Sequence, residues 1–195
     1  MGYREWKDRI RRYEEITRCG AIVRRYFVIG AFDGALTILG VILGAFFAGG
    51  GREQVPLIIA AGLSAAVALA VSSVVGAYEV ERIEKTLDRR RVERALLSEV
   101  GYEHREAYRF AARISAFAHG VSPLIASMIP IVPLYLITDY FWGTVAASIL
   151  TLSLLFLMGW YLGRLAKEFA FFTGLRFVLA GLGTAAIILL IGHGF

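Results

Sequence analysis

The sequence is 195 residues long and 57% hydrophobic, with a mean hydropathy of +0.63. This composition excludes an ordinary soluble globular protein, in which roughly 45–50% of residues are apolar. The net charge of +5 favours anionic lipid headgroups over nucleic acid as partners, because the cations also follow a membrane-topology pattern.

Residues 1–25 precede the first apolar run and are predicted to form an amphipathic helix. Apolar side chains recur there at helical spacing: Tyr3, Trp6, Ile10 and Tyr13. We expect this helix to lie at the cytoplasmic membrane surface with its aromatic rings among the headgroups, and a frayed polar tail is the alternative. The only cysteine, Cys19, excludes an internal disulfide and is either acylated at the membrane surface or incidental.

Five apolar runs are long enough to cross a hydrocarbon core of about 30 Å. They cover approximately residues 26–48, 55–78, 114–138, 140–163 and 174–191. Since only helices and closed barrels satisfy the backbone in lipid, and strand-like alternation is absent, we expect an all-α integral membrane protein with five transmembrane helices. Its predicted segments are the interfacial helix (1–25), two spans (26–78), a charged cytoplasmic helical connection (79–113) and three further spans (114–195).

The lysines and arginines are distributed asymmetrically about these spans. Twenty of the 21 fall before the first span, between the second and third, or around the connection of the fourth to the fifth, and the opposite side holds Arg52 alone. By the positive-inside rule, the N-terminus is cytoplasmic and the C-terminus lies outside. We expect a multi-pass integral membrane protein, located in the cell membrane if the chain is prokaryotic.

The first span contains a carboxylate, Asp33, about 10 Å beyond its cytoplasmic start. A charge at that depth costs roughly 2.5–3.5 kcal/mol on insertion scales, so it indicates a partner or a function. Asp33 and Thr37 share a helix face with two glycines, and a second pair of glycines forms a neighbouring surface for close helix packing. The four packing glycines are Gly30, Gly34, Gly40 and Gly44. This pattern suits the wall of a cation path, and a structural aspartate bonded to a neighbouring helix is the alternative.

The second span continues into an acidic stretch at its cytoplasmic end. A cation that passes Asp33 meets Glu79 there, followed by Glu81 and Glu84. We expect two helices in the connection 79–113, with a break near Gly101. Acidic faces on these helices make Glu81, Glu84, Glu103 and Glu106 candidate metal ligands together with Asp33. The alternative is local pairing of Glu81 with Lys85, Arg89 with Glu93 and Glu106 with Arg109.

The third span contains Pro123, Pro130 and Pro133, each of which removes a backbone donor. We therefore expect a kinked or broken helix. Met128 lies in this stretch as a possible soft ligand or a packing residue. His119 precedes it, either as a proton relay or in a hydrogen-bonded packing role.

The stretch "GAFDGALTILGVILG" resembles the first-helix signature of the vacuolar iron transporter family, which is close to GxxDGxxTxxGxxxG. Residues 129–133 resemble the family's third-helix IPxxP segment, and residues 174–192 resemble its fifth helix. The resemblance implies a homodimer that exports Fe²⁺ or Mn²⁺ from the cytoplasm in exchange for protons, along a path at the dimer interface. The metal is then a substrate, with no permanently bound cofactor, and Asp33 is a transport residue.

The second helix departs from this family, whose pattern there is SMAxGEY. Ser73 replaces the ion-contacting methionine and Ala77 replaces the glutamate. Ser73 stays in the predicted path with Asp33, Thr37 and Glu79, but oxygen ligands suit manganese as well as iron. The short connection also lacks the family's longer metal-binding domain.

Other functions have less support in the sequence. No nucleophile elbow, phosphate loop or zinc-protease motif is present, and the Asp33-Gly34 pair lacks the further aspartates of a CDP-alcohol phosphatidyltransferase. We therefore expect no enzymatic activity. The remaining alternative is a membrane scaffold or metal sensor that keeps the fold without transporting, which the substitutions in the second helix favour.

Overall fold

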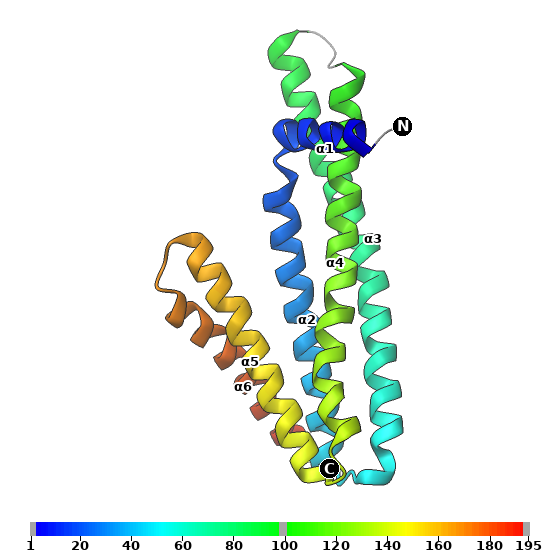
Figure 1. Ribbon diagram of the computed structural model, residues 1–195, viewed down its shortest axis with the longest axis vertical. Helices are drawn as coiled ribbons and strands as arrows, with labels where there is room; N and C mark the ends of the chain where they lie inside the picture. Colours follow the sequence, from blue (N-terminus) through cyan, green and yellow to red (C-terminus); the bar gives the residue numbers. More distant parts are fainter. Residues whose placement is uncertain (1–2, 98–100, 193–195) are drawn as a thin grey trace. The chain divides into compact units, whose positions relative to one another are not determined.

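The computed structural model describes residues 3–97 and 101–192, nearly all of them helical (Figure 1). The helices are α1 (Tyr3–Thr17), α2 (Cys19–Phe47), α3 (Val55–Leu96), α4 (Tyr102–Leu136), α5 (Tyr140–Ala166) and α6 (Ala170–Gly192), with a 3₁₀ turn, η1, at Arg52–Gln54. Helices α2 to α6 are long and apolar enough to cross a membrane. The five predicted spans are confirmed, and the chain is a multi-pass integral membrane protein.

Two of these helices are much longer than a membrane requires. Helix α3 has 42 residues and is therefore about 63 Å long, twice the thickness of a hydrocarbon core. Helix α4 has 35 residues. As predicted, the charged connection continues both spans as helices, because α3 ends at Leu96 and α4 begins at Tyr102, on either side of the expected break.

The chain packs as two units, and the first comprises Met1–Ile29 and Ala70–Val121. Within it, α1 runs crosswise to the adjoining parts of α2, α3 and α4 (Figure 1). Tyr13 of α1 is buried and its ring centroid lies 5.5 Å from that of Phe110, whereas Trp6 is 53% exposed. The predicted helix is confirmed, but Tyr13 contacts protein and is not free for headgroups. The side chain of Tyr3 lies outside the described part of the chain.

The second unit comprises Gly30–Leu69 and Ser122–Phe195, and α2 supplies much of its core. Ile38 and Ile42 of α2 are about 1% exposed and pack against three other helices. Their buried partners are Val55 and Ile58 of α3, Leu134 of α4 and Ala147 of α5. A second cluster joins Ala31 and Ala35 to Ala126 and Leu155. Both clusters fix the rotation of α2 within this unit.

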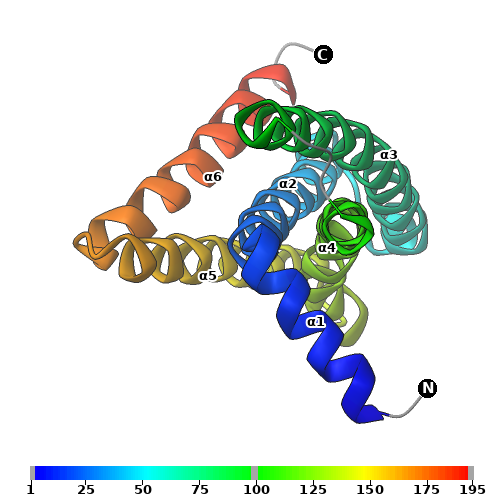
Figure 2. The same cartoon turned by 90° about the horizontal axis from the view of Figure 1, so that it is seen from above.

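Helices α5 and α6 form a hairpin whose closed end is made by small residues. A Cβ atom on Gly159 would lie 2.7 Å from the Thr173 carbonyl oxygen, and one on Gly163 would lie 2.6 Å from the Ala170 Cα. Lys167 ends α5 in the left-handed conformation with φ of 57°. Close backbone approach through small residues is how membrane helices commonly associate. The two helices diverge beyond this contact (Figure 2).

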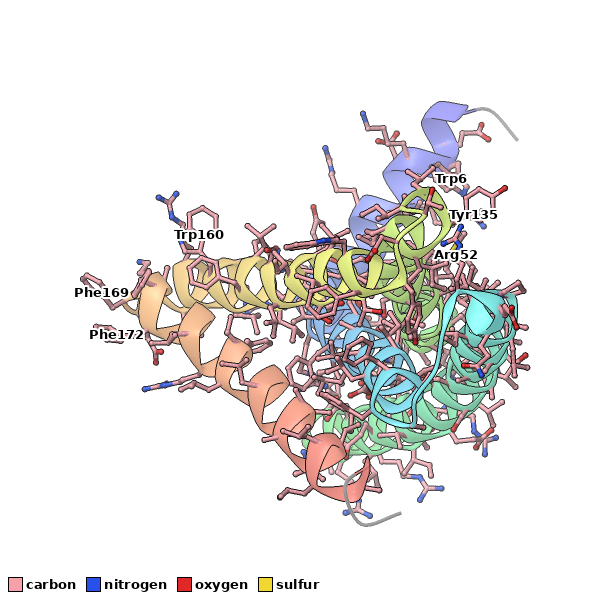
Figure 3. The ribbon with its side chains drawn as sticks, turned by 90° about the horizontal axis from the view of Figure 1, so that it is seen from below. Trp6, Arg52, Tyr135, Trp160, Phe169 and Phe172 are labelled. Carbon is pink, nitrogen blue, oxygen red and sulfur yellow. The ribbon has the colours of Figure 1, made fainter. Side chains whose placement is uncertain are left out.

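Aromatic side chains project from the turn of this hairpin. Trp160, Phe169 and Phe172 point outward at that end (Figure 3), and Phe169 is 73% exposed. The Arg164 guanidinium lies 4.6 Å from the Trp160 ring centroid, a cation–π contact. Aromatic rings beside cations are typical of the boundary between lipid and water. The turn between α5 and α6 therefore has the composition of a membrane-surface loop.

Helix α4 corrects the expectation for the third span. Pro123, Pro130 and Pro133 all lie inside one continuous helix, so the predicted break is absent. Pro123 and Pro130 are less than 2% exposed. Packing against neighbouring helices holds the backbone in place although each proline removes a donor, as is common in membrane helices.

Candidate functional site

Asp33 lies in the part of α2 that belongs to the second unit, where its neighbours in sequence fix its direction. Phe32 packs edge-on against Phe177 of α6, with ring centroids 5.0 Å apart. Gly34 is buried against α4. Successive side chains of an α-helix point about 100° apart around its axis. The contacts of Phe32 with α6 and of Gly34 with α4 therefore fix the direction of the Asp33 side chain, which points between those two contacts. Asp33 and Thr37, one turn further on, are both half-buried.

The contact between Gly34 and α4 is a direct approach of two backbones. A Cβ atom on Gly34 would lie 2.6 Å from the Pro123 Cα. Ser127 of α4 is completely buried and its hydroxyl donates a hydrogen bond to the Gly34 carbonyl oxygen at 3.0 Å. The prediction that Gly34 allows close helix approach is confirmed. Ser127 was missed, because a single serine in an apolar helix gives no sequence signal of its partner.

The remaining packing glycines have different surroundings. A Cβ atom on Gly40 would lie 3.6 Å from Ile188 of α6, and one on Gly44 would lie 4.0 Å from the same side chain. These are ordinary van der Waals distances, so α2 and α6 are in contact there without requiring glycine. Gly30 is buried. The helix contact therefore requires glycine at Gly34, whereas the space at Gly40 and Gly44 would admit a Cβ atom.

The acidic residues of α3 belong to the first unit, and most of them lie beside basic side chains. Glu79 is exposed and lies 2.7 Å from Arg82. Glu81 has a side chain only 4% exposed and lies 3.6 Å from Arg25 of α2, with the Tyr26 hydroxyl within hydrogen-bonding reach. Its predicted pairing with Lys85 is wrong. Lys85 instead lies 3.7 Å from Asp88.

The acidic residues of α4 are paired in the same way. Glu103 lies 3.4 Å from Arg12 of α1, and Glu106 lies 3.7 Å from Arg109. Across residues 3–97 and 101–192, no three acidic, histidine or cysteine side chains converge as a metal site. The structure does not bring Glu81, Glu84, Glu103 and Glu106 together with a third such ligand among the described residues, and their role as metal ligands stays a prediction. Arginines lie beside Glu81, Glu103 and Glu106. The predicted Arg89–Glu93 and Glu106–Arg109 pairs are confirmed.

The remaining candidate residues are Ser73, His119 and Met128. Ser73 is 8% exposed and faces the interior of the first unit. His119 Nδ1 lies 2.9 Å from the Tyr26 carbonyl oxygen, and the two rings are in contact with centroids 5.1 Å apart. This geometry supports the packing interpretation of His119. Met128 is 58% exposed.

Two comparisons with known proteins relate this chain to others. Residues 79–193 match the model of the VIT family. An uncharacterized protein of Methanocaldococcus jannaschii is 33% identical over 175 residues, which cover 88% of this chain and 89% of that protein. The matched region of the family model contains α4, α5, α6 and the charged end of α3. Asp33 and its signature lie before that region.

Proposed function

Because this chain belongs to the VIT family, we propose that it exports a divalent transition-metal ion, Fe²⁺ or Mn²⁺, from the cytoplasm. Family membership indicates ion transport across a membrane. We further propose that the ion is Fe²⁺ or Mn²⁺, that it moves outward and that it is exchanged for protons. These proposals rest on the first-helix signature and on the distribution of lysines and arginines, which favours a cytoplasmic N-terminus.

One observation carries the proposal: Asp33 is a carboxylate in the apolar part of α2 and is only half-buried. A carboxylate in a membrane helix is costly, and such groups generally line ion or proton pathways. Phe32 and Gly34 hold the helix on either side of it. A carboxylate held in this way, with the Thr37 hydroxyl one turn away, supplies hard oxygen ligands for a partly dehydrated cation.

Among the described residues of a single chain, no three acidic, histidine or cysteine side chains converge beside Asp33. We therefore propose that two copies line the path, so that Asp33 of each contributes. The exposed face of α3 supports a homodimer, because Ser72 and Gly76 are exposed at four-residue spacing and a Cβ atom on Gly76 would meet nothing within 4 Å. Small residues at this spacing let membrane helices approach closely.

The second candidate is a metal sensor or membrane scaffold that does not transport. Ser73 and Ala77 stand where the family signature has methionine and glutamate, and both are buried. A path that depends on the second helix would lack a soft ligand and a carboxylate there. Retention of Asp33 at its energetic cost favours transport, because a scaffold needs no half-buried acid.

Metal flux into proteoliposomes tests the proposal. We expect Mn²⁺ or Fe²⁺ flux that rises with an opposing proton gradient and falls at least tenfold in Asp33→Asn. Asp139→Asn is the matched control, because Asp139 accepts a hydrogen bond from the Trp142 amide at the start of α5 and asparagine caps a helix equally well. Flux unchanged in Asp33→Asn would exclude a transport role for this residue. Absence of flux for both ions in a folded wild-type dimer would favour the sensor or scaffold.

A further inference from the structure

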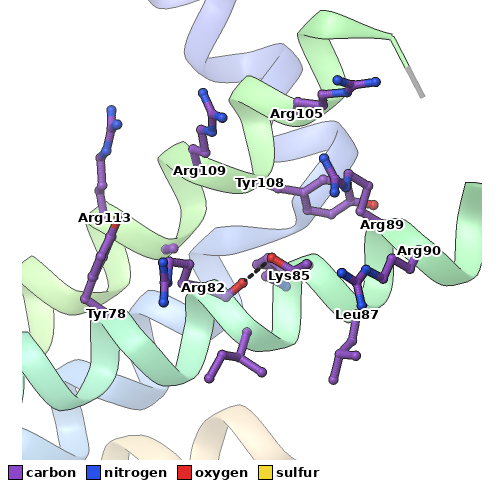
Figure 4. A pocket seen from close by; sticks show the side chains of 13 residues that line it. Tyr78, Arg82, Lys85, Leu87, Arg89, Arg90, Arg105, Tyr108, Arg109 and Arg113 are labelled. Atoms are coloured by element: carbon purple, nitrogen blue, oxygen red, sulfur yellow. Dashed lines mark hydrogen bonds between the residues drawn. The ribbon is translucent and has the colours of Figure 1, made fainter. Parts of the chain in front are cut away.

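The first unit contains an open cavity of about 700 Å³ between the charged ends of α3 and α4 (Figure 4). Cavities of about 300–1,000 Å³ are the usual size for small-molecule sites. Seven of the residues that line this cavity are cationic and none is acidic. The cations are Arg82, Lys85, Arg89 and Arg90 of α3 and Arg105, Arg109 and Arg113 of α4.

Helical spacing brings these cations to one place. Arg105, Arg109 and Arg113 follow one another at four-residue intervals, so they occupy one face of α4. Arg82, Lys85 and Arg89 are spaced by three and four residues and share a face of α3. The two rows line the same cavity from different helices (Figure 4). Like charges four residues apart destabilise a helix, and a bound anion would relieve this repulsion.

Neighbouring carboxylates compensate only part of the charge. Four of the lining cations have a carboxylate within 4 Å: Arg82 beside Glu79, Lys85 beside Asp88, Arg89 beside Glu93 and Arg109 beside Glu106. In the described part of the chain, Arg90 and Arg113 form no ion pair at all.

The cavity also offers uncharged hydrogen-bonding groups. Tyr78 and Tyr108 lie in the lining, and their hydroxyls can donate to an anion. Topology accounts for the number of cations on this side of the membrane, but it does not require them to converge around a cavity. A transported metal cation gains nothing from this positive site, since like charges repel.

We propose that this cavity binds a phosphate group with two or more negative charges, from either a soluble diphosphate or an anionic lipid headgroup. Arginine presents several donors in a planar fork that matches phosphate oxygens, and arginines supply six of the seven cations. The bound phosphate contacts arginines of both α3 and α4, and its negative charge offsets the repulsion between the two rows of cations. The transport proposal assigns this cavity no role, and the site stands independently of it.

Ligand-dependent thermal stability of the full chain in detergent tests the site. The probes are sodium pyrophosphate and dioctanoyl phosphatidate, each at constant ionic strength, with sodium chloride as the reference. The test variant is Arg90→Gln/Arg113→Gln, which removes two lining cations without breaking an ion pair. The matched control is Arg9→Gln/Arg94→Gln, which removes the same charge from exposed positions of α1 and α3 outside the cavity.

We expect one probe to raise the melting temperature of the wild-type protein in a saturable manner. Its half-saturating concentration should rise at least tenfold in the test variant and less than twofold in the control. Saturation by pyrophosphate identifies a soluble ligand, and saturation by phosphatidate alone identifies a lipid headgroup. If the test variant is not monodisperse, Arg90→Gln alone should raise the half-saturating concentration about threefold.

Two results would overturn the proposal. One is the absence of a saturable effect of either probe on the wild-type protein. The other is an equal loss of binding in the test and control variants, which would mean that general surface charge attracts the anion. Neither readout uses metal flux, so failure of this site and failure of the transport proposal are distinguishable.

Discussion

A Cβ atom on Gly34 of α2 would lie 2.5 Å from the carbonyl oxygen of Pro123 on α4. The two backbones therefore touch, one residue after the carboxylate proposed to line the ion path. Both partners are backbone atoms, so a side chain at position 34 cannot be accommodated by rotating a neighbouring side chain. The contact couples the packing of α2 on α4 to the position of Asp33.

Gly34→Ala is expected to destabilise the protein by about 1–3 kcal/mol, the usual cost of overpacking a well-packed contact. Thermal unfolding in detergent, followed by circular dichroism, measures the effect. Gly183→Ala is the matched control, because a Cβ atom there would meet nothing within 4 Å and alanine favours the helix by up to about 1 kcal/mol. Equal melting temperatures for the two variants would contradict the close approach.

The ion pair between Arg25 and Glu81 is asymmetric, with side chains 63% and 4% exposed. Arg25→Met leaves a buried carboxylate without its cation, and we expect a loss of about 1–3 kcal/mol, below the full cost of breaking a buried pair because Arg25 is exposed. Glu81→Gln removes the buried charge together with the need for a partner. We therefore expect Glu81→Gln to lower the free energy of unfolding by less than Arg25→Met does. The double variant Arg25→Met/Glu81→Gln should be as stable as Glu81→Gln.

Thermal unfolding of these three variants forms a double-mutant cycle. Arg24→Met serves as the control, because Arg24 is exposed, adjacent in sequence and forms no ion pair with the described residues. Strictly additive losses in the cycle would show that Arg25 and Glu81 are not coupled.

The sequence predicts the number of helices and much of their extent because these depend on local patterns. Apolar runs of sufficient length set the five spans, and the helix-forming composition around Gly101 predicts the continuation of α3 and α4 into the charged connection. Gly34 is also predictable, since glycines at four-residue spacing signal close helix contact. Its partner Pro123 is not, because the pattern in α2 contains no information about which helix approaches.

Charged residues were harder to interpret from sequence. Acidic residues at helical spacing suggested a metal site, yet arginines of other helices pair with Glu81 and Glu103. Long-range pairs of this kind depend on tertiary packing. In the sequence, the arginines at positions 105, 109 and 113 indicate only membrane topology, and the fold shows that they share a cavity with cations of α3.

Arg52, the one cation on the side predicted to be outside, has a structural role at the end of α4. Its Nη1 atom donates hydrogen bonds to the carbonyl oxygens of Leu134 and Ile137, both at 2.8 Å. These bonds satisfy carbonyls left free at a helix C-terminus and place a positive charge where the helix dipole favours it. Arg52→Met should cost about 1 kcal/mol, measured by thermal unfolding.

Arg52→Lys tests the same cap with its charge retained, and we expect it to recover at least half of the lost stability. Arg9→Met is the control for removal of an exposed cation. If Arg52→Met and Arg9→Met melt at the same temperature, Arg52 does not cap α4.

Cys19 at the start of α2 is 6% exposed and its thiol donates a hydrogen bond to Glu14 at 2.9 Å. Glu14 also accepts from the Gly20 amide at 2.9 Å and so holds the corner between α1 and α2. We expect Cys19 to react slowly with a soluble maleimide in the folded protein and rapidly in dodecyl sulfate, because burial denies access to the reagent. Glu14→Ala should accelerate native labelling at least fivefold and destabilise the corner by about 1 kcal/mol, the usual cost of losing a helix cap. Lys7→Cys in a Cys19→Ser background provides the exposed reference, and wild-type labelling as fast as this reference would contradict the buried thiol and reopen acylation at Cys19.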